Sequence, residues 1–236
     1  MLKTRSLSGI RIPRKSSRSS QLWRHFLVLN LTVFFFAISI STALPASGNG
    51  LVGYWKFDEG AGATAADSSG NNNTGVLING PVWTAGEVGA GLSFDGIDDY
   101  VEVAHSDSLN LARELTVSAW IYNKATHEPS LPQSEYHVVA AKGWAADVGG
   151  SWTLAWDRKT NSLFFCARKN TDNGVKCASF DFGSVTDDWH LITAVFNDGK
   201  LRLYVDGILA AGPVSLGTAR INNNTENVHI GGLPSS

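Results

Sequence analysis

Short strand-like runs, rather than helical periods, fill the chain from residue 51 to its end. Alternation is clearest in residues 115–122 and 201–205, where apolar side chains occupy every second position. Clusters of Gly, Asn, Asp and Pro, such as residues 71–73 and 197–199, separate the runs. Many short runs with such turn residues between them predict an all-β fold of antiparallel strands, either a sandwich or a barrel.

Composition and charge narrow the classes of partner. A hydrophobic content of 43% in 236 residues is enough for a core, and we expect one domain after residue 46. Seven of the 19 basic residues and none of the 21 acidic ones lie in residues 1–50, so the remainder carries a formal charge of −9. An acidic body without a basic cluster argues against nucleic acid or an anionic membrane surface as partner.

The first 46 residues have the order of a secretory signal peptide. A long basic stretch precedes the mostly apolar residues 26–40, and small residues follow, so cleavage is expected after Ala43 or Ala46. The alternative is an uncleaved anchor, although the apolar run is just short of the ~20 residues that span a bilayer. The sequence therefore predicts a secreted or cell-surface protein.

Cys166 and Cys177 are the only cysteines, and both follow the predicted signal. Asn173-Gly174 lies between two strand-like runs and predicts a hairpin that brings the cysteines onto neighbouring strands. In an exported protein this pair predicts a disulfide, the alternative being two buried thiols.

Six short sequence segments, in a fixed order, carry a resemblance to a known protein family. They are VGYWKFDEGAG (52–62), DSSGNNNTG (67–75), VWTAGEVGAGLSFDGIDDYVEV (82–103), LTVSAWIY (115–122), DDWHLITAVFN (187–197) and GKLRLYVDGILA (199–210). The series resembles the laminin G-like modules of the concanavalin A-like lectin and glucanase superfamily. The resemblance implies a two-sheet antiparallel jelly-roll sandwich over residues 47–236, used mostly for extracellular recognition.

Calcium is the cofactor that the resemblance implies. Its first ligand matches Asp58, and its ligand loop matches residues 67–73, which include Asp67 and Asn71. Carboxylate and carbonyl oxygens suit this hard cation. The alternative is that these side chains make turn hydrogen bonds to the backbone. The acidic turn at residues 95–99 is another metal candidate, and a hairpin loop with solvated carboxylates is the preferred interpretation there.

The last strand of the family pattern has no counterpart after residue 232. We therefore expect either a fragment of a longer protein, which is the preferred interpretation, or a variant with an exposed sheet edge. Exposed edges invite aggregation.

Aromatic residues in 136–156 are the candidates for sugar contacts, because aromatic faces stack on pyranose rings. Tyr136, Trp144 and Trp152 are the predicted contacts. Trp152 shares a strand face with Leu154 and Trp156, which is also typical of core residues.

Catalysis is not expected. The chain has no Glu-x-Asp-x-x-Glu run of the kind the superfamily's glucanases use, and no Gly-x-Ser-x-Gly elbow, HExxH helix or phosphate loop. The sequence thus predicts a non-catalytic module that binds carbohydrate or glycoproteins. The alternatives are an adhesive protein–protein module of a larger surface protein, and an accessory domain of a glycoside hydrolase or sialidase.

Overall fold

The computed structural model describes residues 50–122, 136–146, 150–182 and 188–234. The predicted signal peptide, residues 1–46, lies outside this part of the chain. None of the helices within the described residues is long and apolar enough to cross a membrane. The described chain is built from strands and one short 3-10 helix, η1 (Asp107–Leu109), which confirms the all-β prediction.

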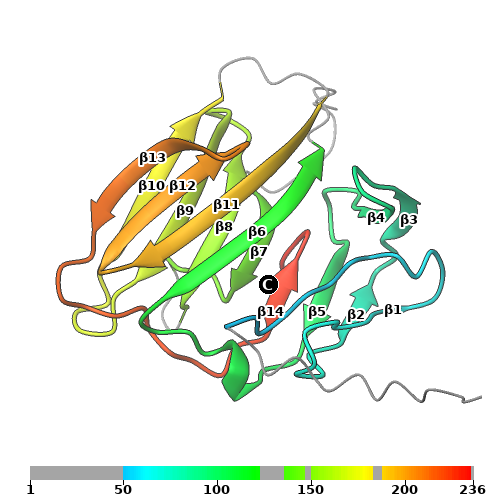
Figure 1. Cartoon of the computed structure of the whole chain (residues 1–236), viewed down its shortest axis with the longest axis horizontal. Coiled ribbons are helices and arrows are strands. Elements are labelled where there is room, and N and C mark those ends of the chain that lie inside the picture. Colours follow the sequence, from blue (N-terminus) through cyan, green and yellow to red (C-terminus); the bar gives the residue numbers. More distant parts are fainter. Residues whose placement is uncertain (1–49, 123–135, 147–149, 183–187, 235–236) are drawn as a thin grey trace, which may run out of the picture. The chain divides into compact units, whose positions relative to one another are not determined.

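Eight strands form the larger sheet, in the order β1-β2-β5-β14-β7-β8-β9-β10 (Figure 1). All of its paired neighbours are antiparallel. Its strands are β1 (Thr64–Ala65), β2 (Gly75–Ile78), β5 (Tyr100–Val103), β7 (Tyr136–Lys142), β8 (Trp152–Asp157), β9 (Ser162–Arg168), β10 (Val175–Asp181) and β14 (Val228–Ile230).

Four strands form the second sheet, in the order β13-β12-β11-β6, and a separate hairpin pairs β3 with β4. Their bounds are β3 (Val82–Ala85), β4 (Ala90–Ser93), β6 (Leu115–Tyr122), β11 (Trp189–Asn197), β12 (Lys200–Val205) and β13 (Ile208–Ser215). The tight turn after β11 has Asp198 and Gly199 at positive φ, the conformation that an Asp-Gly hairpin requires.

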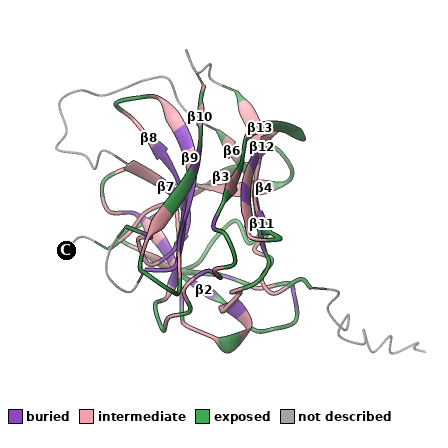
Figure 2. Ribbon diagram, turned by 90° about the vertical axis from the view of Figure 1, so that its left-hand side faces the viewer, coloured by how far each residue is buried: buried purple, intermediate pink, exposed green. Residues whose placement is uncertain are grey.

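The core lies between the two sheets, as expected for a sandwich. Buried side chains gather along β8 and β9 (Figure 2), where Leu154, Leu163 and Phe165 have no exposed surface. From the smaller sheet, Ile192 and Leu203 pack into the same cluster. Burying one such side chain contributes about 1.5–3 kcal/mol. The sequence alternation that predicted strands therefore corresponds to one buried face on each sheet.

The last described strand, β14, lies inside the larger sheet. It pairs with β5 on one side and β7 on the other, so the run that ends the sequence pattern is not itself a bare edge. The prediction that a final family strand is missing stays untested.

The predicted disulfide is confirmed. Cys166 on β9 and Cys177 on β10 are directly opposite each other in the strand register, and their sulfur atoms are bonded. Asn173, in the connecting turn, has a positive φ, as the hairpin prediction required. The disulfide thus joins the two outermost strands at one end of the larger sheet.

We expect His229 to make the fold less stable in acid. This β14 side chain is 6% exposed, and burial lowers its pKa although Glu102, 3.4 Å from Nε2, opposes the shift. A lowered pKa in the folded state means that the unfolded chain binds the proton first, so stability falls as pH drops below about 6.5. His229→Gln should therefore flatten the fall in Tm between pH 7 and pH 5. An unchanged slope would contradict this role.

Candidate carbohydrate-binding face

Three aromatic side chains form a cluster on the outer face of the larger sheet, turned away from the smaller sheet. Tyr136 begins β7, Trp144 follows β7, and Phe164 lies on β9. The Tyr136 and Trp144 ring centroids are 5.1 Å apart, and Phe164 meets both rings edge-on at 5.6 and 6.1 Å. Tyr136 and Trp144 are half-buried, so each ring keeps an accessible part. Such rings combine apolar area with a polar atom.

A β-bulge changes which residues of β7 lie on this face. The register of β7 against β8 shifts between Val138 and Ala140. Val138, before the shift, faces outward with the aromatic cluster, and after the shift Ala141 does so, whereas Ala140 joins the core between the sheets. One extra residue reverses the alternation and re-aims the side chains that follow it.

The turn after β7 holds Trp144 in place through its backbone. The Ala145 N–H donates to Thr153 Oγ1 at 2.9 Å, and the Ser151 N–H donates to the Lys142 carbonyl at 3.0 Å. Gly150 is required here, because a Cβ at this position would lie 1.8 Å from the Trp144 carbonyl oxygen. Hydrogen bonds and close packing therefore hold the described residues at both ends of this turn.

The Arg168 side chain donates hydrogen bonds to the same turn. Its side chain is 4% exposed and donates to the carbonyls of Ala145 (Nε, 3.0 Å), Ala146 (Nη2, 2.7 Å) and Asn173 (Nη1, 2.8 Å). A guanidinium presents its donors in a rigid planar fork, so one side chain can serve three carbonyls at once. Arg168 thus connects the Trp144 turn to the β9–β10 turn.

Two hollows lie on either side of the Tyr136–Trp144 pair and share both residues. The first measures about 340 Å³ and lies over β8, β9 and β10. The second measures about 420 Å³ and lies between the β4–β5 loop, β7 and residues 231–234. Their polar lining residues are Thr153, Asp157, Thr160, Ser162 and Ser179 in the first, and Asp99 and His137 in the second.

Trp152 was predicted as a sugar contact, and that prediction is wrong. Its side chain is 5% exposed and belongs to the core cluster between the sheets, together with Leu154 and Trp156. The alternation of β8 turns these three residues inward and leaves Thr153 and Asp157 on the outer face. The structure brings Tyr136 and Trp144 together, but whether they touch a sugar stays a prediction.

The predicted calcium ligands are engaged in backbone hydrogen bonds. Asp67 accepts from four donors: Tyr54 N and Ser69 N at Oδ1, and Ser69 Oγ and Asn73 N at Oδ2, all at 2.8–2.9 Å. Burial alone would raise the pKa of Asp67, but the hydrogen bonds outweigh it and the pKa is lowered. Each oxygen thus already accepts two hydrogen bonds, which favours the interpretation as a turn.

Asp58 and Asn71 likewise bind the chain itself. Asp58 Oδ1 accepts from Ala90 N at 3.0 Å, and the Asn71 amide donates to the carbonyl of Leu51 at 3.2 Å. These contacts favour the interpretation as turn hydrogen bonds. Calcium at these residues stays a prediction.

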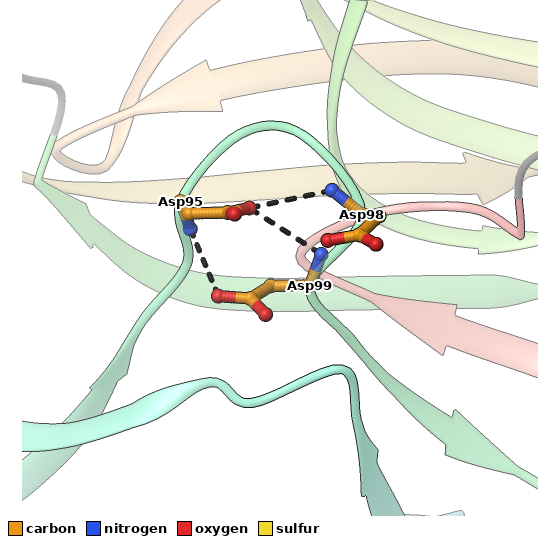
Figure 3. A group of neighbouring side chains, drawn as sticks. All are labelled: Asp95, Asp98 and Asp99. Atoms are coloured by element: carbon orange, nitrogen blue, oxygen red, sulfur yellow. Dashed lines mark hydrogen bonds between the residues drawn. The ribbon is translucent and has the colours of Figure 1, made fainter.

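The acidic turn between β4 and β5 contains Asp95, Asp98 and Asp99 (Figure 3). Asp95 Oδ1 accepts from the N–H groups of Ile97, Asp98 and Asp99, and Asp99 Oδ2 accepts from Asp95 N. These bonds lower the pKa of Asp95, whereas burial raises the pKa of Asp99. The carboxylate oxygens lie within 4.8 Å of one another. The hydrogen bonds drawn in Figure 3 stabilise the turn itself, which favours its interpretation as a hairpin loop.

Sequence reasoning missed Phe164, Arg168 and Asp99 as parts of this face. A signal for the first two was present, because Phe164 and Arg168 alternate with the core residues of β9 and share a face with Cys166. No local signal places Asp99 beside Trp144, since the two residues are brought together by the sheet.

Comparison with protein-family profiles shows the family to which this chain belongs. A family profile described as the concanavalin A-like lectin/glucanases superfamily matches residues 95–236, more than half of the chain. The chain belongs to this superfamily. Membership in the concanavalin A-like superfamily confirms both the family resemblance and the two-sheet jelly-roll sandwich. Among curated proteins, none matches this concanavalin A-like chain.

Solved structures are similar to this chain at low sequence identity. Domain 4 of the extracellular arabinanase AbnA from Geobacillus stearothermophilus, in complex with arabinotriose, is 14% identical, with a TM-score of 0.50 over 79% of this chain and 85% of that one. A Trypanosoma rangeli sialidase complex is 17% identical, with a TM-score of 0.49 over 79% of this chain and 28% of that one. The carbohydrate binding module CBM66 from Bacillus subtilis is 12% identical, with a TM-score of 0.32 over 66% and 90%.

Proposed function

We propose that this chain is a non-catalytic carbohydrate-binding module that recognises glycans through Tyr136 and Trp144. The observation that carries the proposal is the aromatic pair itself, which is part-exposed between two hollows and held by a fixed turn. A preorganised site loses less entropy on binding. Superfamily membership and the arabinotriose bound by the arabinanase domain support the same class of ligand.

Export is part of the proposal. A disulfide between Cys166 and Cys177 is expected to persist only in an oxidising compartment, which supports a secreted or cell-surface location. A recognition module attached to a glycoside hydrolase or sialidase would meet its substrate in such a place.

Adhesion to another protein is the second candidate, and a different surface favours it. The outer face of the smaller sheet exposes Trp120 by 45%, Tyr122 by 41% and Leu209 by 48%. Tyr122 packs edge-on against Trp189 with ring centroids 5.4 Å apart. Exposed apolar patches of this kind mark protein interaction sites in many proteins.

Trp144→Ala tests the proposal, with Trp120→Ala as the matched control. Binding to arabinotriose and to a glycan array identifies a ligand, whose affinity is then measured by calorimetry. Loss of an anchoring aromatic costs about 2 kcal/mol or more, so Trp144→Ala should weaken binding roughly 30-fold. Trp120→Ala should leave the affinity within twofold.

Two outcomes would contradict this proposal. One is a wild-type protein that binds no glycan on the array, and the other is a Trp144→Ala variant with unchanged affinity. Capture of a purified surface protein that is lost only in Trp120→Ala would favour the adhesive function instead.

A further inference from the structure

The two hollows adjoin the same pair of aromatic side chains. Each is lined by both Tyr136 and Trp144, so a ligand that stacks on this pair borders both spaces. The first hollow continues toward Ser179 on β10, and the second continues toward Ile97 in the β4–β5 loop. A single sugar ring over the aromatic pair would leave the far part of each hollow empty.

The lining of this site offers carboxylates and neutral polar groups. Asp157 lines the first hollow and Asp99 the second, and no Lys or Arg among the described residues lines either one. Lys159 lies two residues after Asp157 and outside the lining, but its backbone N–H donates to Asp157 Oδ1 at 2.8 Å and its charge also acts on that carboxylate. Arg168 is close by, yet its donors are already bound to the carbonyls of Ala145, Ala146 and Asn173.

Charge decides which sugars such a lining accepts. Proteins bind sugar carboxylates or sulfates with Arg or Lys, whose charged hydrogen bonds are roughly twice as strong as neutral ones. Asp99 and Asp157 would instead repel an anionic sugar at close range. A carboxylate is a strong acceptor for neutral hydroxyl groups, which are the donors that uncharged sugars supply.

We infer that the ligand is an uncharged oligosaccharide that crosses the Tyr136–Trp144 pair and enters both hollows, with Asp99 and Asp157 accepting its hydroxyl groups. This inference rests on the proposed function and specifies its ligand class and length. Affinity should then rise steeply from one sugar unit to three, because only a chain of several units reaches both hollows.

Matched glycans test the charge. Galactotriose is compared with trigalacturonate by calorimetry at pH 8, beside arabinose, arabinobiose and arabinotriose as a length series. The neutral member should bind at least about tenfold more tightly than its charged counterpart. An equal or higher affinity for the charged member of the pair would overturn the assignment to neutral glycans.

Two substitutions test the span. Ser179→Arg fills the far part of the first hollow, and Ile97→Arg fills that of the second, where Ile97 is 51% exposed and outside the core. Each should weaken trisaccharide binding about tenfold, whereas neither should affect a monosaccharide, which lies over the aromatic pair and leaves the far part of each hollow empty. Thr116→Arg, exposed on β6 of the other sheet, is the matched control for added charge.

The outcomes separate the inference from the proposal beneath it. Trisaccharide affinity that is unchanged in either hollow variant, or equal to monosaccharide affinity, would overturn the two-hollow ligand while glycan binding stands. A wild-type protein that binds none of these glycans and none on the array would remove the proposed function and this inference together.

Discussion

Replacing Arg168 with alanine is expected to lower the free energy of unfolding by about 3 kcal/mol, because it leaves the buried carbonyl of Ala145 without a donor, at about 1–3 kcal/mol, and removes two part-buried hydrogen bonds to the carbonyls of Ala146 and Asn173. For a domain of this size, that loss corresponds to a fall in Tm of about 8 °C. Arg168→Lys should restore little of it, since one ammonium cannot reach carbonyls spread around a guanidinium fork. Thermal and urea unfolding measure both variants.

Arg113→Ala is the matched control, because Arg113 is exposed and its removal should change stability by less than about 0.5 kcal/mol. Arg168→Ala should also weaken glycan binding more than Arg113→Ala does, since Ala145 and Ala146 follow Trp144 directly. A stability loss below about 1 kcal/mol for Arg168→Ala would show that these carbonyls find other partners.

The double variant Cys166→Ala/Cys177→Ala should lose about 3 kcal/mol of stability. The bridge joins residues 11 apart in the sequence, and closing so short a loop restricts the unfolded chain by roughly that free energy. The expected fall in Tm is about 8 °C. Reducing agent should lower the Tm of the wild type to that of the variant and leave the variant itself unchanged.

Alkylation provides an independent measurement of the same bridge. The oxidised native protein should take up no label under denaturing conditions, because both sulfur atoms are bonded to each other. Two labelled cysteines, or a double variant with the wild-type Tm, would mean that the bridge does not stabilise this protein.

The two largest predicted losses of stability come from two connections at the same end of the larger sheet. Arg168 and Cys166 lie on β9 with their side chains on its outer face, beside Phe164. The disulfide joins β9 to β10, and Arg168 joins the β9–β10 turn to the turn that carries Trp144. Stability and the placement of the proposed binding face are therefore coupled through β9.

Local patterns predicted the strands and the disulfide well. Alternation in residues 115–122 predicted the buried face of β6 because side chains of a strand point to opposite faces in turn. Asn173-Gly174 predicted the β9–β10 turn because both positions tolerate a positive φ, and that turn alone fixes which residue lies opposite Cys166.

Local patterns did not predict the site to the same extent. Tyr136 and Trp144 were selected as aromatic residues near one another in the chain, but Trp152 was selected on the same ground and lies in the core. Asp67 has residue types around it that suit calcium, yet its oxygens accept backbone hydrogen bonds from residues 54 and 69–73. Residue type alone does not distinguish a surface aromatic residue from a core one, or a calcium ligand from a hydrogen-bond acceptor in a turn.

By itself, the sequence determined that this chain forms antiparallel strands with alternating buried side chains and one hairpin disulfide, because those properties follow from alternation and turn chemistry over a few residues. The two-sheet arrangement was implied by the family resemblance. Only the tertiary structure decided that β14 lies between β5 and β7, that a bulge in β7 turns Ala141 outward, and that Arg168 holds the Trp144 turn. These features depend on strand order and on contacts between residues that are far apart in the sequence, and no local pattern encodes them.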